Sequence, residues 1–311
     1  MTLTTPRDLT FDSHGTSCAA WHFPATGYAL EGPGGRPVVV MAHGLGGTKD
    51  SGLAPFAEAL AGAGLDVLAF DYRGFGASEG DPRQQVSVTR QQEDYRAAMA
   101  LAATLPGVDP ARVVLWGVSL AGGHVLSVAA GRDDVAAVVS LTPLVDGLAA
   151  GRHALASHKP SAMARSTAAG VASRVAGLRG RPARTMPVVG RPGETAALTL
   201  DGCYEDYLAI AGPTWRNEVD AAVGLELGSV RATRDAKQVT CPALFQIADL
   251  DRSAPPHAAA KAAFAARAVV RHYPADHFDV WPGKPWHEAV VRHQVAFLAR
   301  TLRTAQVGAD A

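Results

Sequence analysis

Residues 113–123, VVLWGVSLAGG, join an apolar run to a run of small residues, with a serine at the junction. The apolar run Val113–Trp116 is typical of a strand covered on both faces, and a helical pattern follows Ser119. Glycine or alanine at positions 117, 121, 122 and 123 leaves room for a sharp turn between the two elements. The stretch therefore predicts a strand–turn–helix unit that exposes the Ser119 hydroxyl at the carboxyl end of the strand.

Similar apolar runs recur on both sides of this unit, with helical patterns between them. The expected strands are 38–41, 65–70, 113–116, 135–141, 243–247 and 269–273, and the expected helices are 51–63, 86–105, 119–130, 255–266 and 286–303. This alternation is typical of βαβ units. Two alternating runs, Leu9–Ser13 and Thr16–Pro24, predict an antiparallel hairpin turning at His14-Gly15. We expect an α/β fold with one doubly wound, mostly parallel sheet of about eight strands and helices on both faces.

The alternation stops between residues 144 and 237, where Ala- and Arg-rich amphipathic stretches are broken by Gly and Pro. We expect a mainly helical cap at 144–237, inserted into a core domain formed by 1–143 and 238–311. Residues 144–200 contain eight basic and two acidic residues, a balance of +6. Two interpretations stay open, a solvated surface that uses Arg for its helix propensity and a surface that attracts an anionic substrate.

Composition excludes several classes of protein. The chain has 311 residues, of which 48% are hydrophobic and 19% charged, as in ordinary globular proteins. Lys plus Arg equals Asp plus Glu at 29 each, so we expect neither a nucleic-acid nor a membrane partner. The three cysteines, at 18, 203 and 241, form no disulfide framework or zinc motif. We expect a cytoplasmic protein without a metal, a signal peptide or a membrane span.

A glycine-rich segment, His43-Gly44-Leu45-Gly46-Gly47, ends the first parallel strand. Its flexible backbone would let the Leu45 amide face a reacting carbonyl, and the Leu120 amide would supply the second donor of an oxyanion hole. His43 is interpreted as a structural residue that holds this loop, with a direct chemical role as the alternative. The chain contains no GxxxxGK[ST] motif, and Gly74-Phe75-Gly76 has Glu79 in place of a third glycine, which excludes nucleotide binding.

A serine nucleophile needs a base and an acid that orients the base. Asp249 and Asp251 follow one expected strand and His277 follows the next, so all three should lie at the same sheet edge as Ser119. Asp251 is favoured because it is better separated from the strand, and Asp249 stays open. Three other histidines fall inside an expected strand or the last helix: His272, His287 and His293.

The chain resembles the α/β-hydrolase superfamily over residues 37–303. The resemblance is carried in particular by the motifs at residues 43–47, 70–78 and 117–122. The chain is similar to a bacterial group of dipeptidyl-peptidase-like and acetyl-esterase-like hydrolases, which also has acyl-transferring members. The resemblance implies Ser119 as nucleophile, Asp251 as acid, His277 as base, and the amides of Leu45 and Leu120 as oxyanion donors. Two positions depart from the usual pattern, since Ala121 and Ala248 occupy places commonly held by glycine. Neither change removes a catalytic group.

The resemblance implies a serine hydrolase that cleaves a carboxylic ester or thioester of a small acyl substrate through an acyl-enzyme, without a cofactor. A dehalogenase or epoxide hydrolase is excluded, because those enzymes need a carboxylate at position 119. An acyltransferase, an amide or peptide hydrolase and a non-catalytic ligand-binding receptor stay open, as does a homodimer. Aromatic residues near the end of the expected cap either contact the substrate or pack the cap on the core: Tyr204, Tyr207 and Trp215.

Overall fold

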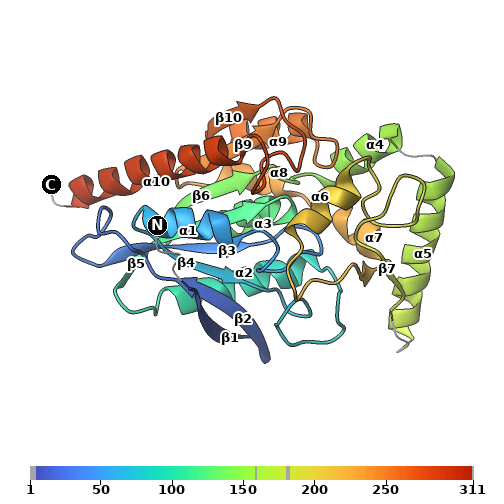
Figure 1. Cartoon of the computed structure of the whole chain (residues 1–311), viewed down its shortest axis with the longest axis horizontal. Coiled ribbons are helices and arrows are strands. Elements are labelled where there is room, and N and C mark those ends of the chain that lie inside the picture. The colour runs from blue at the N-terminus through green and yellow to red at the C-terminus, as the bar shows by residue number, and fades with distance from the viewer. Residues whose placement is uncertain (1–4, 158–159, 180–182, 310–311) are drawn as a thin grey trace.

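A sheet of eight strands crosses the molecule in the order β1-β2-β4-β3-β5-β6-β9-β10 (Figure 1). The computed structural model describes residues 5–157, 160–179 and 183–309. The strands are β1 Arg7–Ser13, β2 Thr16–Phe23, β3 Arg36–Ala42, β4 Asp66–Phe70, β5 Val108–Val118, β6 Val135–Leu141, β9 Ala243–Ala248 and β10 Val269–Tyr273. Within this sheet β2 pairs antiparallel with β1 and β4, and the other pairs are parallel. The expectation of one mostly parallel sheet of about eight strands is confirmed.

The hairpin β1–β2 forms where the sequence predicts it. His14 and Gly15 have φ angles of 53° and 77°, as a two-residue type I′ turn requires, and Ser13 pairs with Thr16 across it. The sequence underestimates β5, which begins at Val108 rather than Val113. The extra residues at its start pair with β3 at Arg36, ahead of a register shift.

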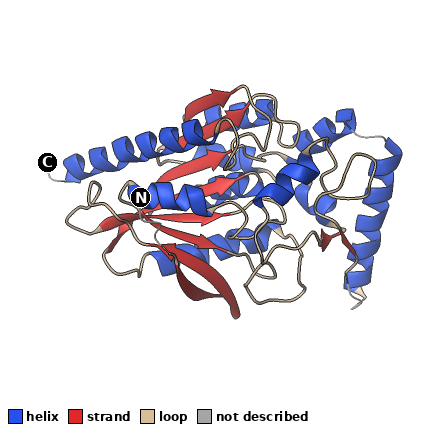
Figure 2. Cartoon of the chain, in the orientation of Figure 1, coloured by secondary structure: helices blue, strands red, loops and turns tan. Residues whose placement is uncertain are grey.

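Helices cover both faces of the sheet (Figure 2). One face carries α1 (Ala54–Gly62) and α10 (His287–Ala309), and the other carries α2 (Val88–Ala102), α3 (Leu120–Ala129), α8 (Ala232–Asp235) and α9 (Pro256–Ala265). All residues of β4 and β9 are buried, as is β3 beyond Arg36. Burial on two faces explains why these strands are nearly continuous apolar runs rather than alternating ones, with the buried Asp66 in β4 and Gln246 in β9 as exceptions.

A long stretch separates β6 from β9, and we call residues 142–242 the inserted segment. It contains the helices α4 (Gly147–Ser157), α5 (Pro160–Leu178), α6 (Cys203–Ile210) and α7 (Val223–Leu227), followed by α8 and a short 3-10 helix, Ala236–Gln238. It also contains a small ribbon, β7 (Thr185–Met186) with β8 (Val219–Asp220), which the sequence does not predict because two-residue strands have no readable period. Figure 1 shows α5, α6 and α7 beyond the carboxyl ends of the parallel strands.

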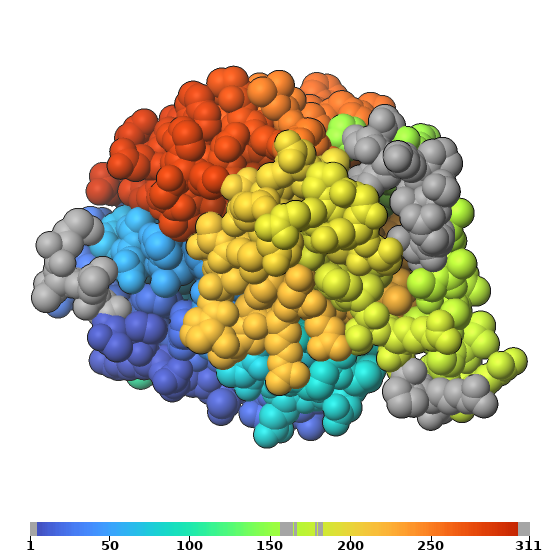
Figure 3. Space-filling model, turned by 45° about the vertical axis from the view of Figure 1, so that its right-hand side comes forward, coloured from blue at the N-terminus to red at the C-terminus, as the bar shows by residue number. Residues whose placement is uncertain are grey.

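The inserted segment also dominates one face of the molecule. In Figure 3 its later residues, coloured yellow to pale orange, gather over the middle of the face between the N-terminal and C-terminal parts of the core. Among the residues that the structure describes, no helix is both long and apolar enough to cross a membrane.

Candidate active site

Ser119 lies at a strained turn between β5 and α3. Its backbone has φ 58° and ψ −120°, a conformation that non-glycine residues rarely adopt. The Ser119 amide donates to the Leu141 carbonyl, and the Ser119 carbonyl accepts from the Leu144 amide, each at 2.9 Å. A Cβ on Gly117 would lie 2.2 Å from the Ala121 carbonyl oxygen, so a side chain there would not fit. The small residues are therefore required by the turn, as the sequence predicts.

The glycine-rich loop after β3, residues 43–52, reaches Ser119 directly. A Cβ on Gly44 would lie 2.8 Å from the Ser119 Cβ and 3.3 Å from its Oγ. Leu45 follows in this loop and is buried, and Leu120 is the first residue of α3. Leu120 therefore directly follows the serine and the loop that carries Leu45 contacts it, with the positive end of the α3 dipole at the same place.

His277 and Asp251 form a buried pair. The His277 Nδ1 donates to the Asp251 Oδ2 at 2.7 Å, because an ionised carboxylate only accepts hydrogen bonds. The other oxygen, Oδ1, accepts the amides of Ser253 at 2.8 Å and Ala254 at 2.7 Å. Both oxygens of Asp251 are thus satisfied, and the second ring nitrogen of His277 stays available for a reacting group.

Opposing effects set the pKa of His277. Burial acts to lower this pKa, but the charge of Asp251, its hydrogen bond and the charge of Asp276 together outweigh burial. The pKa of His277 therefore lies above its ordinary value. A raised pKa makes His277 a stronger base toward a proton that it accepts during the reaction.

A second pair of residues joins the loop of the acid to the loop of the base. The Arg252 Nε donates to the Asp276 Oδ2 at 2.6 Å, and the Arg252 amide donates to Oδ1 at 3.0 Å. The same Oδ1 accepts the His277 amide at 2.8 Å. Neither Arg252 nor Asp276 was predicted from the sequence. The available signal was their opposite charge and their position beside Asp251 and His277 in adjacent loops.

Asp249 has a different neighbour. Its Oδ1 accepts from the Nδ1 of His272 at 2.7 Å, and the side chains of the two residues are 45% and 52% exposed. His272 lies in β10, as the sequence predicts. The structure therefore brings Asp251 to His277 and leaves Asp249 in an exposed pair at the edge of the sheet.

Comparison with known proteins assigns this fold. A family model described as alpha/beta hydrolase fold matches residues 37–284. This chain belongs to the α/β-hydrolase family. It is 35% identical to the quorum-quenching protein AidA of Acinetobacter baumannii (strain MDR-ZJ06) over 299 residues, 95% of each chain. It is 34% identical to the thiohydrolase aneE of Aspergillus aculeatus (strain ATCC 16872 / CBS 172.66 / WB 5094) over 162 residues, 52% of this chain and 50% of the relative. The crystal structure of the α/β hydrolase GrgF from Penicillium sp. sh18 superposes with a TM-score of 0.77 at 23% identity, covering 96% of this chain and 99% of that one.

Three aromatic residues of this α/β hydrolase were predicted either to contact the substrate or to pack the cap on the core. These residues, Tyr204, Tyr207 and Trp215, lie at the boundary between the inserted segment and the core. The Tyr207 hydroxyl donates to the Leu45 carbonyl at 2.7 Å, and the Tyr207 ring lies 5.2 Å from the ring of Trp215. Tyr204 is half-buried and lies under the guanidinium of Arg191, with its ring 4.4 Å from the Arg191 Cζ. A substrate contact by these three residues stays a prediction.

His43 is the first residue of the glycine-rich loop of the α/β hydrolase and is buried. Its Nδ1 donates to the Gly44 carbonyl at 2.9 Å, and burial lowers its pKa, so the ring stays neutral near pH 7. Asp71 holds the far end of the loop, because its carboxylate accepts the Lys49 amide at 2.6 Å and the Lys49 Nζ at 2.8 Å. The same carboxylate accepts the Ala77 amide at 3.0 Å. These contacts agree with a bracing role for the segment that begins at Asp71.

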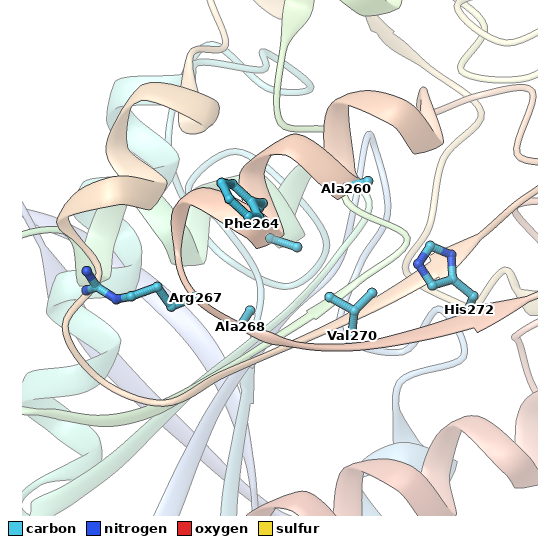
Figure 4. Close-up of a pocket in the computed structure, with 7 residues that line it drawn as sticks. Ala260, Phe264, Arg267, Ala268, Val270 and His272 are labelled. Carbon is cyan, nitrogen blue, oxygen red and sulfur yellow. The ribbon is translucent and has the colours of Figure 1, made fainter.

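An apolar groove lies elsewhere, between α9 and β10 (Figure 4). Its walls are mostly alanine and aliphatic: Ala260, Ala263, Phe264, Arg267, Ala268, Val270 and His272. The groove is open and contains none of the predicted catalytic residues. The groove is therefore separate from the candidate active site of this α/β hydrolase at the Ser119 turn.

Proposed function

We propose that the chain is a serine hydrolase that cleaves a carboxylic ester or a thioester through an acyl-enzyme on Ser119. The observation that carries this proposal is the strained turn at Ser119, at the same sheet edge as the buried His277–Asp251 pair. A strained, partly exposed serine at the same sheet edge as a base with an oriented proton is what acyl transfer by a serine requires.

The reaction follows from these groups. The Ser119 oxygen attacks the carbonyl carbon while the Nε2 of His277 takes the serine proton, and Asp251 stabilises the imidazolium through Nδ1. The carbonyl oxygen becomes an oxyanion, which the amides of Leu45 and Leu120 stabilise. The imidazolium then protonates the leaving alcohol or thiol, and Ser119 keeps the acyl group. Water repeats the sequence, releasing the acid and restoring the serine.

The substrate class has support from a relative. The name thiohydrolase belongs to aneE, which matches half of this chain, and it supports a thioester as the scissile bond. Transfer of the acyl group to an alcohol or amine would use the same acyl-enzyme and differ only in the final acceptor. An amide substrate would differ in its leaving group, which His277 would protonate in the same way.

The test is covalent labelling and turnover by Ser119→Ala. A fluorescent organophosphonate should label the wild type, and p-nitrophenyl esters and acyl thioesters of increasing chain length should be hydrolysed. Ser119→Ala should lose the label and lower turnover by at least about 1,000-fold, as the loss of a triad nucleophile does in serine hydrolases. The matched control is Ser127→Ala on the same helix, where the hydroxyl donates to Asp235 at 2.5 Å. This control should label and turn over like the wild type.

Two results would overturn the proposal. One is labelling of Ser119→Ala at the wild-type rate, which would place the nucleophile elsewhere. The other is a wild type that takes no label and hydrolyses no ester or thioester, which would favour a non-catalytic receptor. Product analysis with added alcohols and amines separates hydrolysis from acyl transfer.

A further inference from the structure

The loop that carries Leu45 is held by a residue from the inserted segment. The Tyr207 hydroxyl, on α6, donates to the Leu45 carbonyl at 2.7 Å across 162 positions of sequence. Tyr207 is 6% exposed. A buried carbonyl that accepts such a bond loses its partner if the hydroxyl is removed, and water does not readily replace it. The contact therefore restrains the backbone of Leu45 directly.

The Tyr207 ring is itself fixed. It lies 5.2 Å from the ring of Trp215 and 5.9 Å from that of Phe278, the residue after His277. Burial raises the pKa of Tyr207, so the hydroxyl keeps its proton and remains a donor at all ordinary pH values. The contacts with these two rings restrict rotation of the Tyr207 side chain and so fix the position of its hydroxyl.

The inserted segment touches the same loop at two further points. Gly46 has φ +65°, and a Cβ there would lie 2.7 Å from the Cγ2 of Val188. Asp50 accepts the Thr214 amide at 2.9 Å. The loop is therefore held on its outer side by three separate residues of the inserted segment: Tyr207, Val188 and Thr214.

The position of this loop matters for the rate. An oxyanion donor acts because it is aimed in advance at the place where negative charge develops, and a displaced donor loses most of its effect. The Leu45 amide belongs to the residue whose carbonyl Tyr207 holds. Both groups are attached to the Leu45 Cα, so a displacement of this residue would move both.

We propose that Tyr207 is a positioning residue for the oxyanion hole, through which the inserted segment sets the strength of transition-state stabilisation at Ser119. This inference rests on the proposed function, because it requires the Leu45 amide to act as a donor. It assigns the Tyr207 hydroxyl to the loop and not to the substrate.

The test compares Tyr207→Phe with Tyr95→Phe. The Tyr95 hydroxyl is buried and donates to the backbone carbonyl of Trp116 at 2.9 Å, so Tyr95→Phe removes the same kind of bond away from the loop. Tyr207→Phe should lower kcat by about 10-fold with KM unchanged, less than the roughly 100- to 1,000-fold cost of losing a whole donor. Tyr95→Phe should leave kcat and KM unchanged. Both should lower the unfolding temperature, and all rates are taken where every variant is folded.

A second readout isolates the oxyanion. An alkylboronic acid binds when the Ser119 oxygen adds to boron and the serine proton passes to His277, leaving a negatively charged tetrahedral adduct in the oxyanion hole. Its affinity should fall by the same factor as kcat in Tyr207→Phe and stay unchanged in Tyr95→Phe. If Tyr207→Phe does not fold, Asp50→Ala decides whether the inserted segment acts through this loop. The substitution releases the Thr214 amide, together with the Thr48 hydroxyl that the same carboxylate accepts, and should lower kcat and boronate affinity together.

Different results would contradict the positioning role of Tyr207 and the proposed function. If Tyr207→Phe matches Tyr95→Phe, or raises KM alone, the positioning role is wrong and Tyr207 packs the segment or contacts substrate. If Asp50→Ala is used and boronate affinity is unchanged, the role is also wrong. A wild type without Ser119-dependent turnover would overturn the proposed function instead.

Discussion

The two halves of the candidate site are held in different ways. The loops of Asp251 and His277 are held from within the core, by the amides of Ser253 and Ala254 and by the Arg252–Asp276 pair. The loop of Leu45 is held at Lys49 by Asp71 of the core, and at Leu45 and Asp50 by residues of the inserted segment. Proton transfer would therefore depend mainly on the core, with one added contact from the insertion, the Asp201 carbonyl that accepts from the Arg252 guanidinium at 2.9 Å. Oxyanion stabilisation would depend more strongly on the insertion. The lesson is that two parts of one active site can depend on the same insertion to different degrees.

The largest effect should come from the core half. Asp251→Asn should lower kcat by about 10,000-fold, because an amide in place of the carboxylate orients the wrong tautomer of His277. Asp249→Asn, the matched control two residues away, should change kcat by less than about twofold, since Asp249 is exposed and pairs with His272. Steady-state kinetics on one ester measures both. A larger loss of kcat in Asp249→Asn than in Asp251→Asn would identify Asp249 as the acid and contradict the assignment of Asp251.

A smaller effect should come from the outer half. Gly46→Ala should lower kcat/KM by about 100-fold, because the new methyl would collide with Val188 and displace the oxyanion loop. Adding Val188→Ala should recover part of the loss. Gly131→Ala is the control, since Gly131 also has positive φ, at 69°, but has no heavy atom within 4 Å of its built Cβ. Equal activity loss in Gly46→Ala and Gly131→Ala would show that backbone strain, and not the contact with the inserted segment, is responsible.

The smallest effect concerns pH. In the wild type kcat/KM should rise with pH, because only neutral His277 accepts a proton, and the midpoint should lie above the ordinary histidine pKa of about 6.5. The charge of Asp276 acts to raise the pKa of His277, so Asp276→Asn should move the midpoint to lower pH. The plateau should fall by no more than about fivefold, the range of a partly exposed ion pair.

The control for the pH shift is Asp134→Asn. Asp134 accepts from the Arg132 Nε at 2.8 Å in an exposed ion pair of the same kind, and this pair does not involve His277. Loss of the Arg132–Asp134 pair should leave the midpoint of the pH profile of kcat/KM unchanged. A midpoint that also stays fixed in Asp276→Asn would mean that the Arg252–Asp276 pair only joins two loops and has no electrostatic effect on the base.

Local sequence determines much of this architecture. The Ser119 turn was predictable because its small residues are neighbours in sequence and its steric demands are local. The nearly continuous apolar strands were predictable because burial on two faces leaves few polar positions. The choice between Asp249 and Asp251 stayed open in the sequence, because both follow β9 and their different partners depend on how the loop turns.

The rest depends on contacts between distant parts of the chain. Tyr207 was predicted from the sequence as an aromatic residue near the site, but its partner was not, because Leu45 is 162 positions away. The same holds for Asp50 with Thr214 and for the β7–β8 ribbon. Such contacts join residues that are far apart in the sequence, and a pattern within one window of sequence does not contain them.

The dependence of the Leu45 loop on Tyr207 has a consequence for protein engineering. Segments such as 142–242 are attractive units for exchange between related enzymes, because they enter and leave the core between two adjacent strands, β6 and β9. A graft chosen only for the shape of its pocket would discard the tyrosine, the valine and the backbone amide that meet the loop from outside. The resulting chimera would bind its new substrate and turn it over slowly. Selection for a new specificity and selection for speed would therefore act on the same hundred residues, and evolution would have to satisfy both at once.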